Sequence, residues 1–118
     1  MLRIIAVIFG IAFIFAGVAG FIPAFALDGY LFGLFEINTM HNIIHIVSGV
    51  VAIMCATSFK STKLYFQIFG AVYLLVAILG FVRGDLIIMH VNMPDNFLHL
   101  AIGAIALYLG FRASSIEA

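Results

Sequence analysis

Apolar residues follow one another in four long runs, which short polar segments separate. The runs cover about Ile4–Phe25, Met40–Ala56, Leu64–Val82 and Asp95–Phe111. Each run is close to the ~17–25 residues that an α-helix needs to cross a bilayer. The pattern therefore predicts four membrane-spanning helices joined by three connections.

Composition agrees with a bilayer as the solvent of this chain. Hydrophobic residues make up 66% of its 118 residues, charged residues only 8%, and the mean hydropathy is +1.32. A water-soluble domain normally has about 25% charged residues. The four spans use nearly the whole chain, which predicts a single domain over residues 1–118 and leaves no room for a soluble catalytic domain. Five basic and five acidic residues give no reason to expect a nucleic-acid partner.

The first run also has features of a secretory signal, because the small-residue sequence Ala24-Phe25-Ala26 follows it. However, it is longer than the roughly 7–15 apolar residues of a typical signal core. We therefore expect it to be a retained membrane span.

Basic residues lie unevenly around the predicted spans. Four flank one side, and Arg83 alone flanks the other; the four are Arg3, Lys60, Lys63 and Arg112. Loops rich in Lys and Arg stay on the cytoplasmic side of a membrane. We therefore expect both termini and the Thr57–Lys63 loop to be cytoplasmic, and the Leu27–Thr39 and Arg83–Pro94 loops to be external.

One polar motif occurs twice. The segment Asn38–His45 returns in the second half of the chain as Asn92–His99, and an Asn, an Asn and a His keep the same spacing in both copies. The match continues beyond the motif, because Gly49 and Ala52 recur at the same offset as Gly103 and Ala106. Most of the unusual polar chemistry of the chain lies in these two copies.

The duplication extends to whole helical hairpins. Ile8-Phe9-Gly10 recurs as Ile68-Phe69-Gly70, and Gly20-Phe21 recurs at the same offset as Gly80-Phe81. Two hairpins that enter and leave on the same side form a parallel repeat around an axis along the membrane normal. The predicted fold is thus an all-α, integral membrane four-helix bundle built from two hairpins, with repeats at about 4–56 and 64–112.

The motif predicts how the second and fourth helices begin. Asn38 and Asn92 come just before an apolar periodic run, where a side-chain oxygen accepts from unpaired amides of the first turn. Pro94 agrees with a helix start, since a proline in the first turn costs no helical hydrogen bond. Asp95 can reach back to the cap. Asn38 and Asn92 are therefore predicted to be helix caps.

Below the caps, helical periodicity predicts a polar cluster. Side chains four residues apart lie on one helix face, and polar side chains of a membrane helix should face the bundle interior. If the second and fourth helices face each other, their polar residues meet near the outer mouth. The predicted cluster consists of His41, Asn42, His45, Asp95, Asn96 and His99.

Three interpretations of the cluster stay open. In the one we favour, Asn and His form hydrogen bonds across helices and fix the register of the bundle, each contributing roughly 0.6–2 kcal/mol. In the second, His41, His45, Asp95 and His99 bind a divalent metal ion. In the third, His45 or His99 is an axial ligand of a tetrapyrrole.

Other function classes have less support. An enzyme is not the expected class, because Ser48 lies near His45 but no oxyanion donors and no acidic orienting group can be named. A channel needs a polar path, whereas the polar face fades after Ser48. The sequence therefore favours a structural or accessory subunit of a larger membrane complex, with the lipid bilayer and membrane-protein subunits as partners.

The chain also resembles a known family. The residues that carry the likeness are Leu31–Asn38, His41-Asn42, His45, Gly80-Phe81, Asn92, Asp95-Asn96 and His99. These resemble the bacterial membrane family called domain of unknown function 4383, and the likeness runs roughly from Phe9 to Gly110. The resemblance implies a four-helix protein, for which a bacterial inner membrane is the expected location. It implies no established activity and no catalytic residues.

Overall fold

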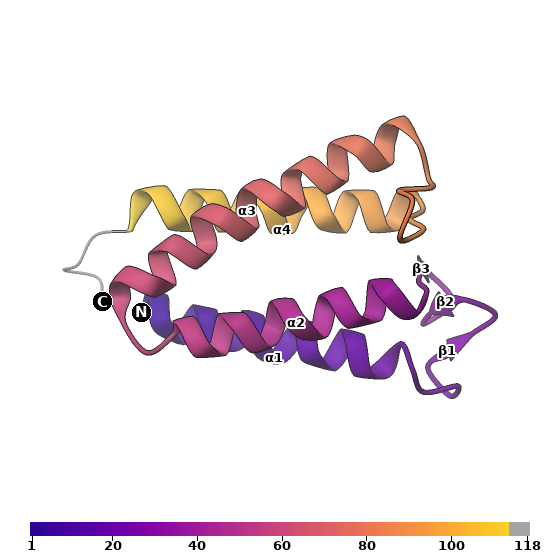
Figure 1. The fold of residues 1–118 in the computed structure, drawn as a ribbon, viewed down its shortest axis with the longest axis horizontal. Helices are drawn as coiled ribbons and strands as arrows, with labels where there is room; N and C mark the ends of the chain where they lie inside the picture. Colours follow the sequence, from indigo (N-terminus) through magenta and orange to yellow (C-terminus); the bar gives the residue numbers. More distant parts are fainter. Residues whose placement is uncertain (114–118) are drawn as a thin grey trace.

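The computed structural model describes residues 1–113, which form four helices and one small sheet (Figure 1). The helices are α1 (Leu2–Ala19), α2 (Thr39–Cys55), α3 (Phe59–Val82) and α4 (Met93–Arg112). The expected all-α, four-helix fold is confirmed. The helices pair as two hairpins, because α1 packs along α2 and α3 packs along α4.

The ends of two helices differ from those expected. α1 stops at Ala19 instead of continuing to Phe25, because Gly20 has a low helix propensity and Pro23 has no N–H to donate. α3 begins at Phe59, ahead of the expected Leu64, because the Ser58 side chain accepts the backbone N–H of Ser61 at 3.2 Å and caps the helix.

The connection between α1 and α2 contains a sheet that the hydrophobic pattern does not predict. Its three strands have two residues each and pair antiparallel in the order β1 (Ala26–Leu27), β2 (Tyr30–Leu31), β3 (Phe35–Glu36). Asp28 and Gly29, both at positive φ, form the tight turn between β1 and β2. Leu31 packs with Ala19 and Ile37 in a small cluster. The sheet thereby closes the end of the first hairpin that lies opposite the amino terminus.

Glycines allow the two helices of each hairpin to approach at the backbone. A Cβ atom added to Gly49 would lie 2.5 Å from the carbonyl oxygen of Gly10. In the second hairpin, a Cβ atom on Gly103 would lie 2.6 Å from the backbone nitrogen of Leu74. Both distances are too short for a side chain. Such close backbone contact is typical of helices that associate in membranes.

A basic side chain closes each hairpin at the end that holds the amino terminus. Arg3 Nε donates to the carbonyl oxygen of Ala56 at 2.6 Å, and Lys63 Nζ donates to that of Ala113 at 2.6 Å. Both carbonyls follow the last turn of a helix, where a positive charge is favourable. The first helix of each hairpin is thus tied to the end of the second.

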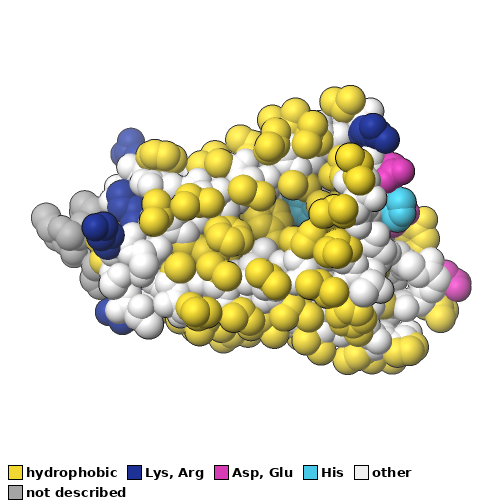
Figure 2. Space-filling view, viewed as in Figure 1, with side chains coloured by type: hydrophobic (Ala, Val, Ile, Leu, Met, Phe, Trp, Pro, Cys, Tyr) yellow, Lys and Arg dark blue, Asp and Glu magenta, His cyan; other side chains and the backbone are white. Residues whose placement is uncertain are grey.

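The surface has an apolar flank between charged ends. Figure 2 shows hydrophobic side chains over the middle of the visible face and most Lys and Arg side chains at one end. Among the described helices, α1 and α3 are long and apolar enough to cross a membrane, and α2 is apolar but has 17 residues. By length and composition, two of the described helices could therefore cross a membrane.

Candidate metal centre

Side-chain caps begin the two helices that carry the repeated motif. Asn38 Oδ1 accepts the backbone N–H of His41 at 2.8 Å and caps α2. Asn92 Oδ1 accepts the backbone N–H of Asp95 at 3.1 Å, and Asp95 Oδ2 accepts the backbone N–H of Asn92 at 3.0 Å. The second pair forms a capping box. These caps fix the rotation with which α2 and α4 enter the bundle.

The two cap residues also connect the hairpins, which sequence reasoning does not reveal. Asn38 Nδ2 donates to the carbonyl oxygen of Ile88, in the connection before α4, at 3.4 Å. Asn92 Nδ2 donates to the carbonyl oxygen of Leu34, in the connection before α2, at 2.9 Å. Each cap thus holds the connection between the two helices of the opposite hairpin.

We expect Asn92→Ala to lower the free energy of unfolding by about 1–2 kcal/mol, because it removes a helix cap and a bond between hairpins. Asn92→Ser keeps an oxygen for the cap but removes the amide that reaches Leu34, so the free energy of unfolding should fall less than in Asn92→Ala. Thermal unfolding of the purified protein in detergent measures both variants. An unchanged midpoint for Asn92→Ala would contradict a role of the cap in stability.

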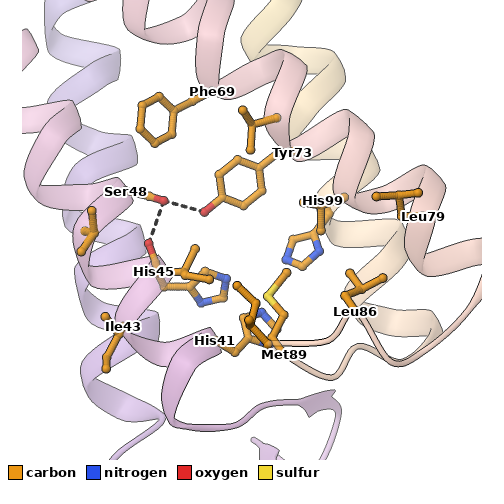
Figure 3. A pocket seen from close by; sticks show the side chains of 15 residues that line it. His41, Ile43, His45, Ser48, Phe69, Tyr73, Leu79, Leu86, Met89 and His99 are labelled. Atoms are coloured by element: carbon orange, nitrogen blue, oxygen red, sulfur yellow. Dashed lines mark hydrogen bonds between the residues drawn. The ribbon is translucent and has the colours of Figure 1, made fainter.

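Below the caps, three imidazoles meet between α2 and α4. His41, His45 and His99 are 1%, 8% and 1% exposed. Their ring centroids lie 4.5 Å apart for His41 and His45, 5.6 Å for His41 and His99, and 6.0 Å for His45 and His99. One nitrogen from each ring lies within 4.8 Å of the other two. We call this group the histidine trio (Figure 3).

Most nitrogens of the histidine trio are buried without a hydrogen-bond partner among the described residues. These are both ring nitrogens of His41 and the Nδ1 atoms of His45 and His99. A buried polar atom left unpaired costs about 1–3 kcal/mol, and native structures rarely leave several together. None of these four nitrogens forms the hydrogen bond with an Asn side chain that the favoured interpretation expects. The trio therefore has an unused capacity to bind a ligand.

Asp95, Asn42 and Asn96 are buried but face other partners than the trio. The carboxylate of Asp95 belongs to the capping box, and the ligand atoms that cluster come from the three histidines. The side-chain oxygen of Asn42 contacts Gly20, and that of Asn96 contacts Gly80. Each oxygen occupies the space that a Cβ atom would take at its glycine, and the Cα–H groups of the glycine can donate weak hydrogen bonds to it. The two asparagines thus pack each hairpin internally.

Two hydroxyl groups lie next to the trio, and neither belongs to the predicted cluster. Ser48 Oγ donates to the carbonyl oxygen of Ile44 at 2.8 Å, and it forms a second bond of 2.8 Å with the Tyr73 hydroxyl. Because the single Ser48 proton is already used, the Tyr73 hydroxyl donates in that second bond. The Tyr73 ring lies 5.5 Å from the His99 ring. Tyr73 occupies the position that Phe13 occupies in the first repeat. This difference between the repeats is the sequence feature that indicates a special role for Tyr73.

The histidine trio borders a cavity of about 410 Å³. Ser48, Tyr73 and Met89 line the same cavity, together with apolar side chains of α2 and α3 (Figure 3). Met89 is buried, and its thioether points into the cavity. A ligand held by the trio would therefore have room beside it and a soft sulfur atom nearby.

This arrangement suits a metal ion better than a tetrapyrrole. Three imidazoles with an open fourth position are a known zinc ligand set, and imidazole together with a thioether suits copper. A macrocycle needs a flat space on the ligating side of an imidazole, whereas the centroids of the trio rings lie only 4.5, 5.6 and 6.0 Å apart. The chemistry that the geometry supports is binding of one transition-metal ion.

Comparisons with known proteins identify the chain at the level of its family. No curated protein and no solved structure matches it. A family model described as domain of unknown function (DUF4383) matches residues 3–112, a range that includes the repeated motif, the caps and the histidine trio. The chain therefore belongs to the DUF4383 family.

Proposed function

We propose that this protein is a small integral membrane protein that binds one transition-metal ion through the histidine trio. The observation that carries the proposal is a group of four buried imidazole nitrogens that have no hydrogen-bond partner among residues 1–113. A single metal ion would take one nitrogen from each ring, so coordination bonds would replace at most three of those missing hydrogen bonds. Neutral imidazole is the ligating form, and a buried position in an apolar bundle favours that form.

The membrane arrangement that we propose has four spans in two repeated hairpins. Its support is that buried positions recur at one constant offset for each pair of helices. Leu2, Ala6, Gly10, Phe13 and Gly17 of α1 correspond in order to Thr62, Phe66, Gly70, Tyr73 and Ala77 of α3. His41, Asn42, His45, Gly49 and Ala52 of α2 correspond in order to Asp95, Asn96, His99, Gly103 and Ala106 of α4. Equivalent buried positions are expected if the two hairpins are repeats.

The orientation that we propose places both termini in the cytoplasm, in a bacterial inner membrane. Four of the five basic residues lie where α1 and α3 begin and α4 ends, and Arg83 directly follows the last residue of α3 at the other end of the bundle. This distribution agrees with the positive-inside rule. In this orientation the trio lies near the external side, close to the beginnings of α2 and α4.

The trio offers three nitrogen ligands, so a fourth has to come from elsewhere. Water or hydroxide would complete a tetrahedral zinc site. The Met89 thioether, which lines the same cavity, would instead favour copper, since soft sulfur ligands select Cu(I). Both ions use the same three imidazoles, and the choice between them depends on Met89.

Metal analysis of the purified protein tests this proposal. The full chain in detergent is dialysed against zinc, Cu(II), or Cu(I) with a reductant, and its metal content and absorption spectrum are then measured. We expect about one tightly held zinc or copper ion per chain. Failure to retain any of these ions would overturn the proposal, and a Soret band would replace it with tetrapyrrole binding.

We also propose that the protein serves as a structural or accessory subunit of a larger membrane complex. The observation that favours this role is the number of large apolar side chains exposed along all four helices, which lipid or partner helices would cover. Blue-native electrophoresis of membranes extracted in mild detergent tests it. We expect a discrete complex with a second membrane protein in a fixed ratio; migration as the free chain would contradict the role.

A further inference from the structure

The connection between α3 and α4 folds into a small unit of its own. We call residues 84–91 of this connection the lid segment. Its backbone bonds close within it: the N–H of Leu86 donates to the carbonyl oxygen of Met89 at 2.9 Å, and the N–H of Val91 donates to that of Gly84 at 2.9 Å. The second bond joins the two ends of the segment. The lid segment can therefore move as one body, with its own hydrogen bonds intact.

Apolar contacts hold the lid segment on the bundle. Met89 and Val91 are 7% and 2% exposed. Val91 packs on α3 at Gly80, where an added Cβ atom would lie 3.1 Å from the Val91 side chain. The tie to α2 is the hydrogen bond from Asn38 Nδ2 to the carbonyl oxygen of Ile88, which is long at 3.4 Å. A segment held in this way opens at a lower cost than a paired sheet.

The tip of the lid segment holds a strained residue. Ile87 has a φ of +71°, and the N–H of Ile88 donates to the carbonyl oxygen of Leu86 at 2.7 Å across it. A bond between residues i and i+2 around a positive φ defines the strained form of the γ-turn, and β-branched residues rarely adopt a positive φ. Ile87 is 88% exposed, so burial does not compensate for the strain. Opening of the segment would release it.

The lid segment also borders the histidine trio. Leu86, Ile88 and Met89 line the same cavity as the three histidines (Figure 3). Among the residues that line this cavity, none comes from the connection between α1 and α2, which is instead paired as a three-stranded sheet. Each histidine of the trio is at most 8% exposed. Some segment therefore has to move before a ligand can reach the trio.

We propose that the lid segment opens as one body and admits the metal ion to the histidine trio at the end of the bundle where α2 and α4 begin. The apolar flank is not a route for the ion, because a charge is costly among apolar side chains and lipid. The strain at Ile87 lowers the cost of opening. The inference rests on the proposed metal site for the purpose of the movement, whereas the movement itself belongs to the chain without metal.

Modification of histidines by diethyl pyrocarbonate in the metal-free full chain in detergent tests the movement. The reagent attacks accessible neutral imidazoles, so the trio reacts only while the lid segment is open. Val91→Ala removes buried contacts of the segment and should speed modification of the trio at least ~10-fold. Leu31→Ala is the matched control, since it removes a buried side chain from the first connection and should change the rate less than ~2-fold. His90 is exposed and gives the reference rate in every variant.

Two further variants act on the strain and on the hydrogen bond. Ile87→Gly relieves the positive φ, stabilises the closed segment and should slow modification of the trio about 3-fold or more. Asn38→Ser keeps an oxygen for the cap of α2 but removes the amide that reaches Ile88, so it should speed modification about 2–5-fold. Unfolding midpoints identify a variant that fails to fold, and the remaining variants then decide the inference.

Zinc exchange connects the movement to the metal. A lid controls access without supplying a ligand, so its variants should change the rates of zinc uptake and zinc loss by the same factor and leave Kd within ~2-fold. Equal reactivity of the trio in all lid variants, or faster reaction in Leu31→Ala than in Val91→Ala, overturns the inference. Unchanged zinc rates in variants whose trio reactivity differs also overturn it. Altered reactivity in a chain that retains no ion supports the lid and removes the metal site.

Discussion

Replacement of His45 by alanine is expected to abolish stoichiometric metal binding. His45 contributes one of three imidazoles whose ligand atoms lie within 4.8 Å of one another, so its loss leaves two ligands. Even groups that only orient a ligand contribute about 10–100-fold to metal affinity, and we expect loss of the ligand itself to weaken binding more than about 100-fold. His99→Ala should have the same effect. Metal content after dialysis against a competing chelator measures it.

Two control variants make this result specific. His90 is exposed and lies 3.7 Å from Asp85, outside the trio, so His90→Ala should keep the full metal content. Asp95→Asn tests the carboxylate that the sequence placed with the histidines. Because Asp95 belongs to the capping box of α4, we expect its variant to lose stability but to keep the metal. Retention of metal by His45→Ala would refute the trio as the site.

A variant of similar volume separates a metal site from a network that holds the helices in register. In metal-free protein, His45→Leu keeps a buried side chain in contact with Phe13 but removes an imidazole whose Nδ1 has no hydrogen-bond partner among the described residues, so the unfolding midpoint should change little. A hydrogen-bonded network would instead lose stability with or without metal.

Met89→Leu tests which ion the site prefers, since it should weaken Cu(I) binding about 10-fold and leave zinc binding unaltered.

The second large effect is expected at the helix contacts inside each hairpin. At Gly103 a Cβ atom would lie 2.6 Å from the backbone nitrogen of Leu74 and 3.0 Å from the carbonyl oxygen of Gly70. Neither backbone atom can move without separating the helices. Gly103→Ala should therefore lower the free energy of unfolding by about 1–3 kcal/mol, and Gly103→Leu should prevent the α3–α4 hairpin from packing.

Ala104 provides the matched control, because it is the next residue of α4 and is exposed. Ala104→Leu adds the same side chain on the outer face and should leave the unfolding midpoint in detergent nearly unchanged. Gly49→Ala tests the equivalent contact in the first hairpin, where a Cβ atom would meet the carbonyl oxygen of Gly10 at 2.5 Å. A stable Gly103→Leu variant would show that the helices are less closely packed than described.

Periodicity and duplication were sufficient to predict four helices and to bring His41, His45 and His99 onto facing surfaces. Local backbone features explain where the predicted cluster and the predicted helix ends differ from the structure. Equivalence with His41 placed Asp95 in the cluster, but a carboxylate at the third position after an N-cap has the cap amide as its nearest donor, and that bond is formed. The apolar run predicts a first helix that reaches Phe25, because hydropathy stays high to that residue, whereas α1 ends at Ala19 and the backbone turns at Gly20.

Other parts of the site depend on tertiary structure that a hydrophobic pattern does not contain. Met89 lines the cavity because the connection before α4 folds back over the bundle, where Asp85 and His90 form an isolated antiparallel bridge. The role of Tyr73 is not predictable from the pattern, since its hydroxyl bonds to Ser48 only because α2 and α3 are adjacent in the fold. The two-residue strands are too short to show alternation, and only the Asp28-Gly29 turn signals them.

The reciprocal bonds of the two cap residues bear on how such a bundle can assemble. Asn38 reaches the second hairpin and Asn92 reaches the first by the same kind of bond, from a side-chain amide to a carbonyl oxygen. Each hairpin therefore carries both the donor and the acceptor of the contact, as the subunits of an isologous dimer do. A separately expressed hairpin is accordingly expected to form a symmetric homodimer, with its own cap amide bound to the loop of a second copy.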